Sequence, residues 1–315
     1  MIIGKNLGDY RILAKTQLGE SGFVYKAVHI ARRQTFALKL LSCRLTEESP
    51  RECQIIQEVL RAAKLDHPNI ARTYPPEFSG QLTLIPLEFI YGQNLSAKIS
   101  DGVSTLDFTL RIALQAAQAL EEAHDQGLVH GRITSNSLIV SSDGDLKIVD
   151  FGLDSISDEM LFADSDNGWP NSYFVAPPKP PLSRFAYLAP EQVQGNPAEV
   201  RSDLFSLGVV LYELLAGQFL FEGQDRQELF RQIQERDLPK ISQVRSGIPS
   251  AWSKLLRGLL DKNTQKRYPS AHSLIEDLRK LNYGLPLDLL SFEKRDPSIS
   301  RRSFFRRFLG EDEAE

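Results

Sequence analysis

The sequence has few of the residues that cross-link a chain or anchor it in a membrane. Only two cysteines, Cys43 and Cys53, occur in 315 residues, which excludes a disulfide framework and a cysteine-based metal site. No stretch reaches the roughly 18 apolar residues of a membrane helix, and the longest candidate, "LFSLGVVLYELLAG", carries Glu213. The start, "MIIGKNLGDYRIL", has no basic region before a long apolar run, so we expect no signal peptide. We therefore expect a cytoplasmic protein with reduced packing cysteines or, alternatively, a regulatory thiol.

A strong excess of one charge is also missing. The formal net charge is −4, with 42% hydrophobic and 25% charged residues. This mild acidity leaves no basic footprint for nucleic acid, so we expect no nucleic-acid partner. The length and composition are those of a globular protein that buries a substantial core without needing disulfide bonds or structural metal ions.

The pattern of the chain changes near its first third. Residues 10–41 are rich in β-branched, aromatic and leucine residues and predict two or three antiparallel strands, and residues 49–64 have the periodicity of a helix. After a strand at 82–90, a long helix is expected at 107–127, then two short strands, and mostly helices from Asp203 to about Leu281. We predict a small strand-rich lobe at about 8–90, a hinge near 88–92, a helical lobe at about 91–282, and a tail at 283–315.

Several short motifs follow one another in a fixed order. They are "LGESGFVYKA", "FALKLL" with Lys39, a helix with Glu58 nine residues before the His of "HPNI", "GLVHGRITSNSLIV", "IVDFGL", "YLAPEQ" and "NTQKRYPSA". Over residues 8–282 the sequence resembles the eukaryotic-like, bacterial-type serine/threonine protein kinases. The resemblance implies an α+β bilobal fold, with an antiparallel sheet and one helix in the small lobe and a mainly helical large lobe.

The resemblance also assigns roles to individual residues. It implies an ion pair between the phosphate-binding Lys39 and Glu58, and a metal-binding role for Asp150. The nucleotide pocket would be formed by Leu18, Gly19, Gly22, Val24, Ala37, Leu87, Glu88, Ile90 and Ile139. The residues expected to act structurally are His130, Phe151, Gly152, Glu191, Asp203 and Arg267. Each also has a plainer interpretation, such as a surface lysine, a solvated glutamate or apolar residues of an ordinary core.

The loop "HGRITSNS" departs from the family pattern His-Arg-Asp-Leu-Lys-Pro-x-Asn. Arg132 occupies the position of the general base, Thr134 that of the phosphate-steadying lysine, and Ser137 that of the second metal ligand. A guanidinium is protonated at any physiological pH and accepts no proton. The loss of a positioned base typically costs about 10²–10⁴-fold in rate.

Two further departures lie near the same reaction centre. The glycine-rich loop from Gly19 to Val24 is two residues shorter than the family pattern, and Arg184 replaces a threonine. We therefore predict a pseudokinase, a regulatory or scaffolding module with a protein partner, in which retained Lys39, Glu58 and Asp150 leave weak binding of ATP and of Mg²⁺ open. The alternatives are an active atypical kinase and a purely structural protein with an occluded pocket.

The C-terminal tail joins basic and aromatic residues in "SRRSFFRRFLG" before an acidic end. A basic amphipathic segment at 301–309 is compatible with a membrane surface or a partner, and a disordered or packed tail is the plainer interpretation. The proline-rich "VAPPKPPLS" cannot be a helix or a central strand and is expected to be an exposed insert.

Overall fold

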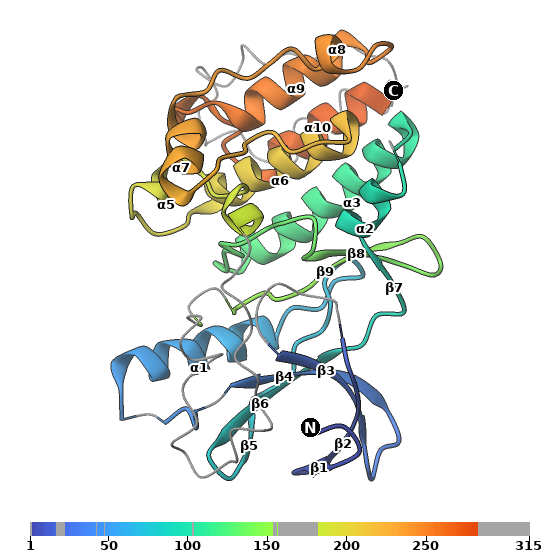
Figure 1. Ribbon diagram of the computed structural model, residues 1–315, viewed down its shortest axis with the longest axis vertical. Coiled ribbons are helices and arrows are strands. Elements are labelled where there is room, and N and C mark those ends of the chain that lie inside the picture. The colour runs from blue at the N-terminus through green and yellow to red at the C-terminus, as the bar shows by residue number, and fades with distance from the viewer. Residues whose placement is uncertain are drawn as a thin grey trace, which may run out of the picture.

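The computed structural model describes residues 2–16, 23–41, 43–46, 48–102, 104–153, 156 and 182–282. The predictions made for the tail, for Leu18, Gly19 and Gly22, and for most of the proline-rich insert lie outside these residues. Figure 1 shows two lobes, a small one built on a sheet and a larger one built from helices, so the predicted bilobal α+β fold is confirmed.

The small lobe is a six-stranded antiparallel sheet with one helix against it. The strands lie in the order β1 (Asn6–Leu7), β2 (Tyr10–Lys15), β3 (Phe23–His29), β4 (Thr35–Leu41), β6 (Leu82–Glu88) and β5 (Glu77–Ser79). Helix α1 (Pro50–Ala62) begins with a proline in its first turn, where the missing N–H is tolerated.

The two faces of this sheet bury different clusters. One face packs Tyr10, Phe36 and Leu38 together, with the Tyr10 and Phe36 rings edge to face at 5.6 Å. The other face packs Leu41 and Ile85 against α1. Because side chains alternate along a strand, Lys39 lies on the same face of β4 as Ala37 and Leu41, toward α1.

The large lobe begins with a small three-stranded sheet next to the connection between the lobes. It contains β7 (Gly92–Asn94), β8 (Leu138–Ser141) and β9 (Leu146–Ile148). The helical elements are α2 (Leu95–Ser100), α3 (Leu106–Asp125), η1 (Leu182–Phe185), α5 (Pro190–Val193), α6 (Val200–Ala216), α7 (Arg226–Glu235), α8 (Ile241–Val244), α9 (Ser250–Leu260), η2 (Thr264–Lys266) and α10 (Ala271–Asn282).

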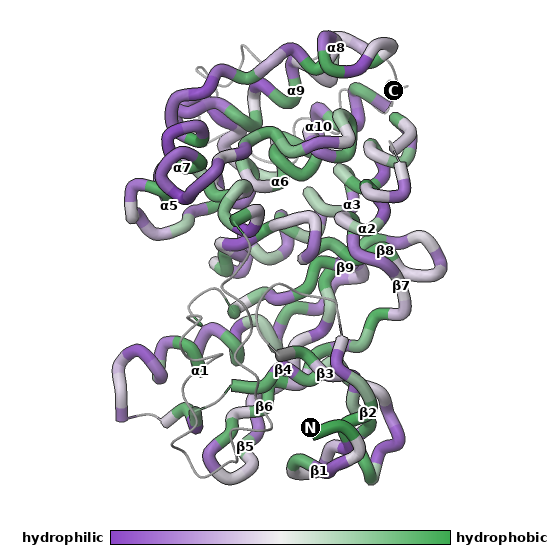
Figure 2. Tube along the Cα trace, viewed as in Figure 1, coloured by the Kyte–Doolittle hydropathy of each residue, from purple (hydrophilic) through white to green (hydrophobic). Residues whose placement is uncertain are grey.

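Helix α6 forms the centre of the large lobe. All its residues from Ser202 to Leu215 are buried, and Figure 2 shows α6 as largely apolar and α7 as largely hydrophilic. Gly208 lets α9 approach closely, since a Cβ at this position would lie 2.7 Å from the Leu259 Cβ. A largely apolar helix that is buried on nearly all sides is the expected core of a helical domain.

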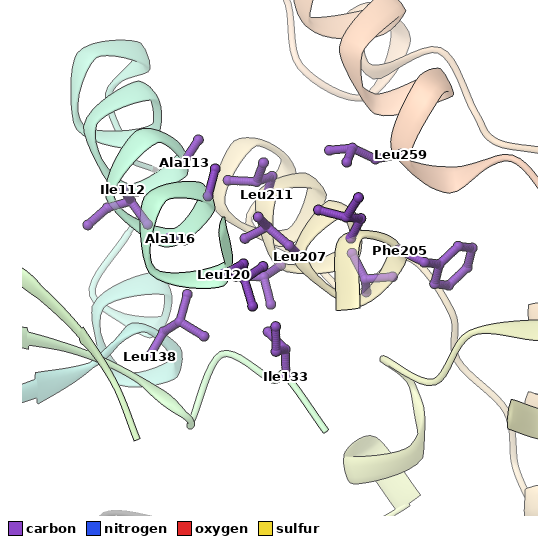
Figure 3. Packing of buried hydrophobic residues seen from close by; sticks show 14 of the residues in the cluster. Ile112, Ala113, Ala116, Leu120, Ile133, Leu138, Phe205, Leu207, Leu211 and Leu259 are labelled. Atoms are coloured by element: carbon purple, nitrogen blue, oxygen red, sulfur yellow. The ribbon is translucent and has the colours of Figure 1, made fainter. Parts of the chain in front are cut away.

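The packing of α3 on α6 also supports the loop between the helix and β8. In Figure 3, Leu120 of α3 and Leu207 of α6 point toward each other, with Ile133 of the loop and Leu138 of β8 beneath them. Thr105 caps α3 by accepting a hydrogen bond from Phe108 N at 3.2 Å, and Gly127 follows its end with a φ of 70°. The loop residues 130–137 are thus joined through Ile133 to the buried core of the lobe.

Among the described residues, no helix combines the length and apolar character needed to cross a bilayer. Cys43 and Cys53 are both free and half-buried.

Candidate nucleotide cleft and catalytic loop

A pocket lies between the lobes, under the sheet of the small lobe. It is lined by Thr16, Val24, Ala37, Leu87, Glu88, Phe89, Ile90, Ile139, Val149 and Asp150. Cross-strand pairing puts Ala37 opposite Leu87, and Ile139 closes the pocket from β8. The structure thus brings together seven of the predicted pocket residues, from Val24 to Asp150. It adds Thr16 and Val149, and also Phe89, which lies in the predicted hinge near 88–92.

The Glu88 carboxylate holds the connection between the lobes in place. It forms an ion pair with Lys147 Nζ at 2.9 Å and accepts a hydrogen bond from Arg72 N at 3.0 Å. The side chain of Glu88 is therefore engaged with β9 and with the segment before β5.

Lys39 and Asp150 meet at the inner end of the pocket. Lys39 Nζ lies 3.5 Å from Asp150 Oδ1, and the side chains of Lys39 and Asp150 are 0% and 15% exposed. Burial lowers the pKa of Lys39, the Asp150 carboxylate opposes this, and the positive charges of Arg132 and Arg184 lower it further. Asp150 has a φ of 71°, an unusual conformation for a residue with a side chain and one found at functional sites.

The predicted ion pair between Lys39 and Glu58 is wrong for this conformation. Within the described part of the chain, Lys39 is paired with Asp150, and Glu58 Oε1 accepts a hydrogen bond from Gln54 Nε2 at 2.8 Å on the outer side of α1.

The physical reason is the packing of the segment that follows Asp150. Leu153 and Ile156 are buried between α1 and the sheet, together with Ile55 and Val59 of α1. Gly152 touches the helix backbone, since a Cβ there would lie 2.6 Å from Glu58 O. Leu153 and Ile156 occupy the space between α1 and the sheet, and the Glu58 carboxylate lies outside it.

The backbone of the loop "HGRITSNS" is held from below by Asp203. Its Oδ2 accepts a hydrogen bond from His130 N and its Oδ1 one from Gly131 N, both at 2.8 Å, and His124 Nε2 lies 2.9 Å from Oδ2. Asp203 is 1% exposed. A buried carboxylate that accepts two N–H groups fixes the loop strongly, because each group would be costly to leave unpaired.

His130 is part of the core. Its ring lies edge to face on Phe151 with centroids 4.7 Å apart, and its Nε2 lies 2.9 Å from Val149 O. The imidazole therefore joins the loop to the segment that carries Asp150.

The side chains of Thr134 and Ser137 bond within the loop itself. Ser137 Oγ accepts a hydrogen bond from Thr134 N at 2.9 Å and donates to Thr134 O at 3.0 Å. Thr134 Oγ1 accepts hydrogen bonds from the N–H groups of Asn136 and Ser137 at 3.2 and 3.3 Å. Both residues are buried, so at the family's lysine and asparagine positions the side chains stabilise a turn.

A buried network joins this loop to α6. Tyr187 Oη donates to Glu213 Oε2 at 2.6 Å, so the Ser135 hydroxyl, 2.8 Å away, donates to Tyr187. Gln192 Nε2 also donates to Gly131 O at 2.7 Å. In the sequence, the only indication of this network was Glu213, a charged residue within an otherwise apolar helical segment.

Glu191 of α5 and Arg267, which follows η2, form a bidentate ion pair in the large lobe. Arg267 Nη1 and Nη2 donate to Glu191 Oε1 and Oε2 at 2.7 and 2.8 Å, and Ser202 Oγ donates to Oε1 at 2.6 Å. Arg267 is 0% exposed. Burial raises the pKa of Glu191, but the hydrogen bonds from Arg267 and Ser202 outweigh it and hold the pKa below its usual value.

The residues present fit Mg²⁺ poorly. This ion prefers several oxygen ligands in octahedral geometry, and the cleft offers Asp150, which is already paired with Lys39. The hydroxyl at the second family position, Ser137, bonds to Thr134. In the described ranges, no group of three or more His, Cys, Asp and Glu residues is placed to hold a metal ion.

Comparison with known proteins agrees with the fold. The profile of the protein kinase domain matches residues 10–278. A probable serine/threonine-protein kinase of Clostridium acetobutylicum is 28% identical over 90% of this chain and 42% of its own length. The serine/threonine-protein kinases PrkC of Bacillus subtilis and PknL of Mycobacterium bovis are 26% and 28% identical over 89% and 88% of the chain, covering 41% and 67% of their lengths. The chain spans about two fifths of the length of the first of these relatives.

Proposed function

The chain belongs to the protein kinase domain family, and we propose on this premise that it is a pseudokinase, a regulatory or scaffolding module that responds to a nucleotide and acts through a protein partner. One observation carries the proposal. Arg132 occupies the base position of a loop whose backbone is fixed from below by Asp203. The loop therefore carries the Arg132 guanidinium at the position where phosphoryl transfer to a hydroxyl needs a proton acceptor.

The neighbouring positions support the same function. Thr134 and Ser137 are buried and engaged with each other, so neither steadies a transferring phosphate nor binds a metal from its present position. Losses at residues that act as a unit are not additive, but each removes part of the machinery.

The pocket and Lys39 support binding of the nucleotide. The apolar lining suits an adenine ring, and Lys39 provides a buried cation at the inner end. Stabilisation by ATP in thermal unfolding, lost in Lys39→Ala, tests the nucleotide response; unchanged melting at millimolar ATP would leave a scaffold without one.

A second candidate function is an active, atypical serine/threonine kinase. The observation in its favour is the retained pair of Lys39 and Asp150 at the end of the pocket. The named relatives are serine/threonine kinases, a family that works with ATP and Mg²⁺.

Transfer of labelled phosphate from ATP to a broad set of protein substrates separates the two functions. We expect no transfer above that of a boiled sample. Turnover that disappears in Asp150→Ala and persists in Asp143→Ala, an exposed aspartate in the turn between β8 and β9, would establish the active kinase and overturn the pseudokinase.

A further inference from the structure

A second pocket lies in the large lobe, where the connection from α7 to α8 meets α9, and we call it the α9 pocket. Its apolar surface comes from the buried Ile241 and Leu256 and the half-buried Leu238, while Lys240 and Arg257 line it as exposed cations. It shares no lining residue with the nucleotide pocket. Figure 1 shows α8 and α9 at the end of the large lobe opposite the small lobe, so the two pockets are separate sites.

The size of the α9 pocket suits one side chain better than a whole cofactor. Its open volume is about 260 Å³, below the range of about 300–1,000 Å³ that is typical of small-molecule pockets. Ile241 and Leu256 are each 1% exposed and belong to the core of the lobe, so the apolar surface is held in place by packing. An apolar side chain placed against them would lose its contact with water, which favours binding.

The chain around this pocket is basic, although the protein as a whole is acidic. Residues 236–262 contain six lysines and arginines against two aspartates, whereas the formal net charge of the protein is −4. Three of the six cations stabilise the lobe itself. The side chains of Arg236, Arg245 and Lys262 donate hydrogen bonds to backbone carbonyl oxygens at distances between 2.6 and 2.8 Å.

The other three cations, Lys240, Lys254 and Arg257, are exposed. The side chains of Lys240 and Arg257 form no hydrogen bond or ion pair with another described residue, and no carboxylate lines the pocket. Lys254 lies three residues before Arg257 on α9, so these two side chains project from the same side of the helix. The positive charge beside the apolar surface is therefore not neutralised within the described part of the chain.

An acidic peptide matches this surface better than a lipid bilayer does. A basic helical surface that binds a bilayer does so with protruding apolar residues. In the described ranges, the large apolar residues with the greatest exposure are Ile3, Leu13, Ile30, Phe78 and Tyr91, and none of them belongs to α7, α8 or α9. At the α9 pocket the apolar residues are buried and the cations are exposed, an arrangement complementary to an apolar side chain flanked by carboxylates.

We propose that the α9 pocket is a docking site for an acidic peptide of a protein partner, which places one apolar side chain against Ile241 and Leu256 and its carboxylates beside Lys240 and Arg257. The inference rests on the scaffolding role in the proposed function and specifies the chemistry of the partner. Because the α9 pocket and the nucleotide pocket have no lining residue in common, the partner and a nucleotide can be bound together.

The experiment is a titration of a fluorescein-labelled peptide, Glu-Asp-Glu-Leu-Glu-Asp-Glu, with the purified full chain, followed by fluorescence anisotropy. One control peptide has glycine in place of the leucine, and the other has lysine in place of every acidic residue. We expect the leucine peptide to bind about tenfold more tightly than the glycine peptide, because it buries an apolar side chain, and the lysine peptide not to bind. Equal binding of the leucine and glycine peptides, or no binding of the acidic leucine peptide, would overturn the inference.

Charge reversals locate the site. Arg257→Glu should weaken binding of the acidic peptide by about tenfold, whereas Arg279→Glu, the same change at an exposed position on α10, should leave it unchanged. The double variant Lys240→Glu, Arg257→Glu should bind the lysine peptide in place of the acidic one, a gain that unfolding cannot produce. Equal weakening by Arg257→Glu and Arg279→Glu, or a double variant that binds neither peptide, would contradict the proposal.

Phosphatidylglycerol vesicles separate a peptide from a membrane surface. Co-sedimentation of the parent that is lost in the double variant, without binding of the acidic peptide, would assign the surface to a membrane and overturn the inference.

The failures of this inference and of the pseudokinase proposal are distinguishable. Absence of peptide binding in a chain that transfers no phosphate would overturn the docking site and leave the pseudokinase. Phosphate transfer from ATP by a chain that binds the acidic peptide would overturn the pseudokinase and leave the docking site.

Discussion

The loop 130–137 has an inner face that meets α6 and an outer face that meets the cleft. On the inner face, Asp203 accepts the N–H groups of His130 and Gly131, and Tyr187 joins Ser135 to Glu213. On the outer face, Arg132 adds a positive charge near Lys39, and Thr134 and Ser137 bond to each other. The inner face keeps the contacts that shape the loop, while the outer face carries Arg132, Thr134 and Ser137 where the kinase pattern has aspartate, lysine and asparagine.

The eight loop residues therefore have two separate roles: the inner face stabilises the fold, and the outer face determines the chemistry of the cleft. The inner face contributes to the stability of the fold, because its polar groups are buried and would be costly to leave unpaired. On the outer face Arg132 is half-buried, so this residue can change at a smaller cost to the fold than the buried acceptor Asp203. Substitutions on the two faces should therefore differ first in stability and then in binding.

The largest effect is expected for Asp203→Ala. It removes the acceptor of two buried N–H groups and of His124, so we expect a loss of about 3–5 kcal/mol in the free energy of unfolding, measured by urea denaturation. Asp203→Asn keeps one acceptor oxygen and should lose less. An equal loss in Asp107→Ala, at the exposed start of α3, would contradict the role of Asp203.

Glu191→Gln should come next, with a loss of about 3 kcal/mol at neutral pH, because it leaves the buried Arg267 without a carboxylate. The folded-state pKa of Glu191 is lowered, so its contribution is complete above the unfolded value of about 4.3 and is lost as pH falls through the folded pKa. Urea denaturation from pH 7 to 3 should therefore show a smaller acid-side loss for Glu191→Gln than for the parent. Identical pH profiles would contradict this role.

Arg132→Asp tests the outer face. We expect no gain in phosphate transfer beyond the assay background, because Thr134, Ser137 and Arg184 remain, and a change in the free energy of unfolding of less than about 1 kcal/mol. The measurement combines the labelled-phosphate assay with urea denaturation. A gain within the about 10²–10⁴-fold expected of a general base would show that the rest of the site is competent.

The smallest effect is expected for Gln54→Ala. It removes the 2.8 Å hydrogen bond to Glu58 on the exposed side of α1 and should change the free energy of unfolding by less than about 0.5 kcal/mol.

Ile156→Ala is the matched control on the buried side of α1. It should lower the free energy of unfolding by about 2–4 kcal/mol, because it empties part of the apolar cluster between α1 and the sheet. Equal melting temperatures for the two variants would contradict the packing explanation.

The sequence was most informative where a residue type fits only one environment. The ordered motifs predicted the two lobes, and Glu191 and Arg267 lie together as the resemblance implied. Val24, Ala37, Leu87 and Ile139 share the pocket as the resemblance implied, although these residue types would also fit an ordinary core. The pairing of Lys39 with Glu58 failed because it depends on where α1 lies, and the placement of Leu153 and Ile156 decides that.

What the sequence by itself determined is the class of the fold and the identity of the groups in the cleft, above all the guanidinium at position 132. The fold class and the residues of the cleft follow from hydrophobic periodicity and motif order, because the type and spacing of residues are properties of the sequence itself. Only the tertiary structure decided which groups meet: Lys39 with Asp150, and Ser137 with Thr134. These contacts join segments that lie far apart along the chain or depend on a packed turn, so their geometry is set by burial and mutual packing.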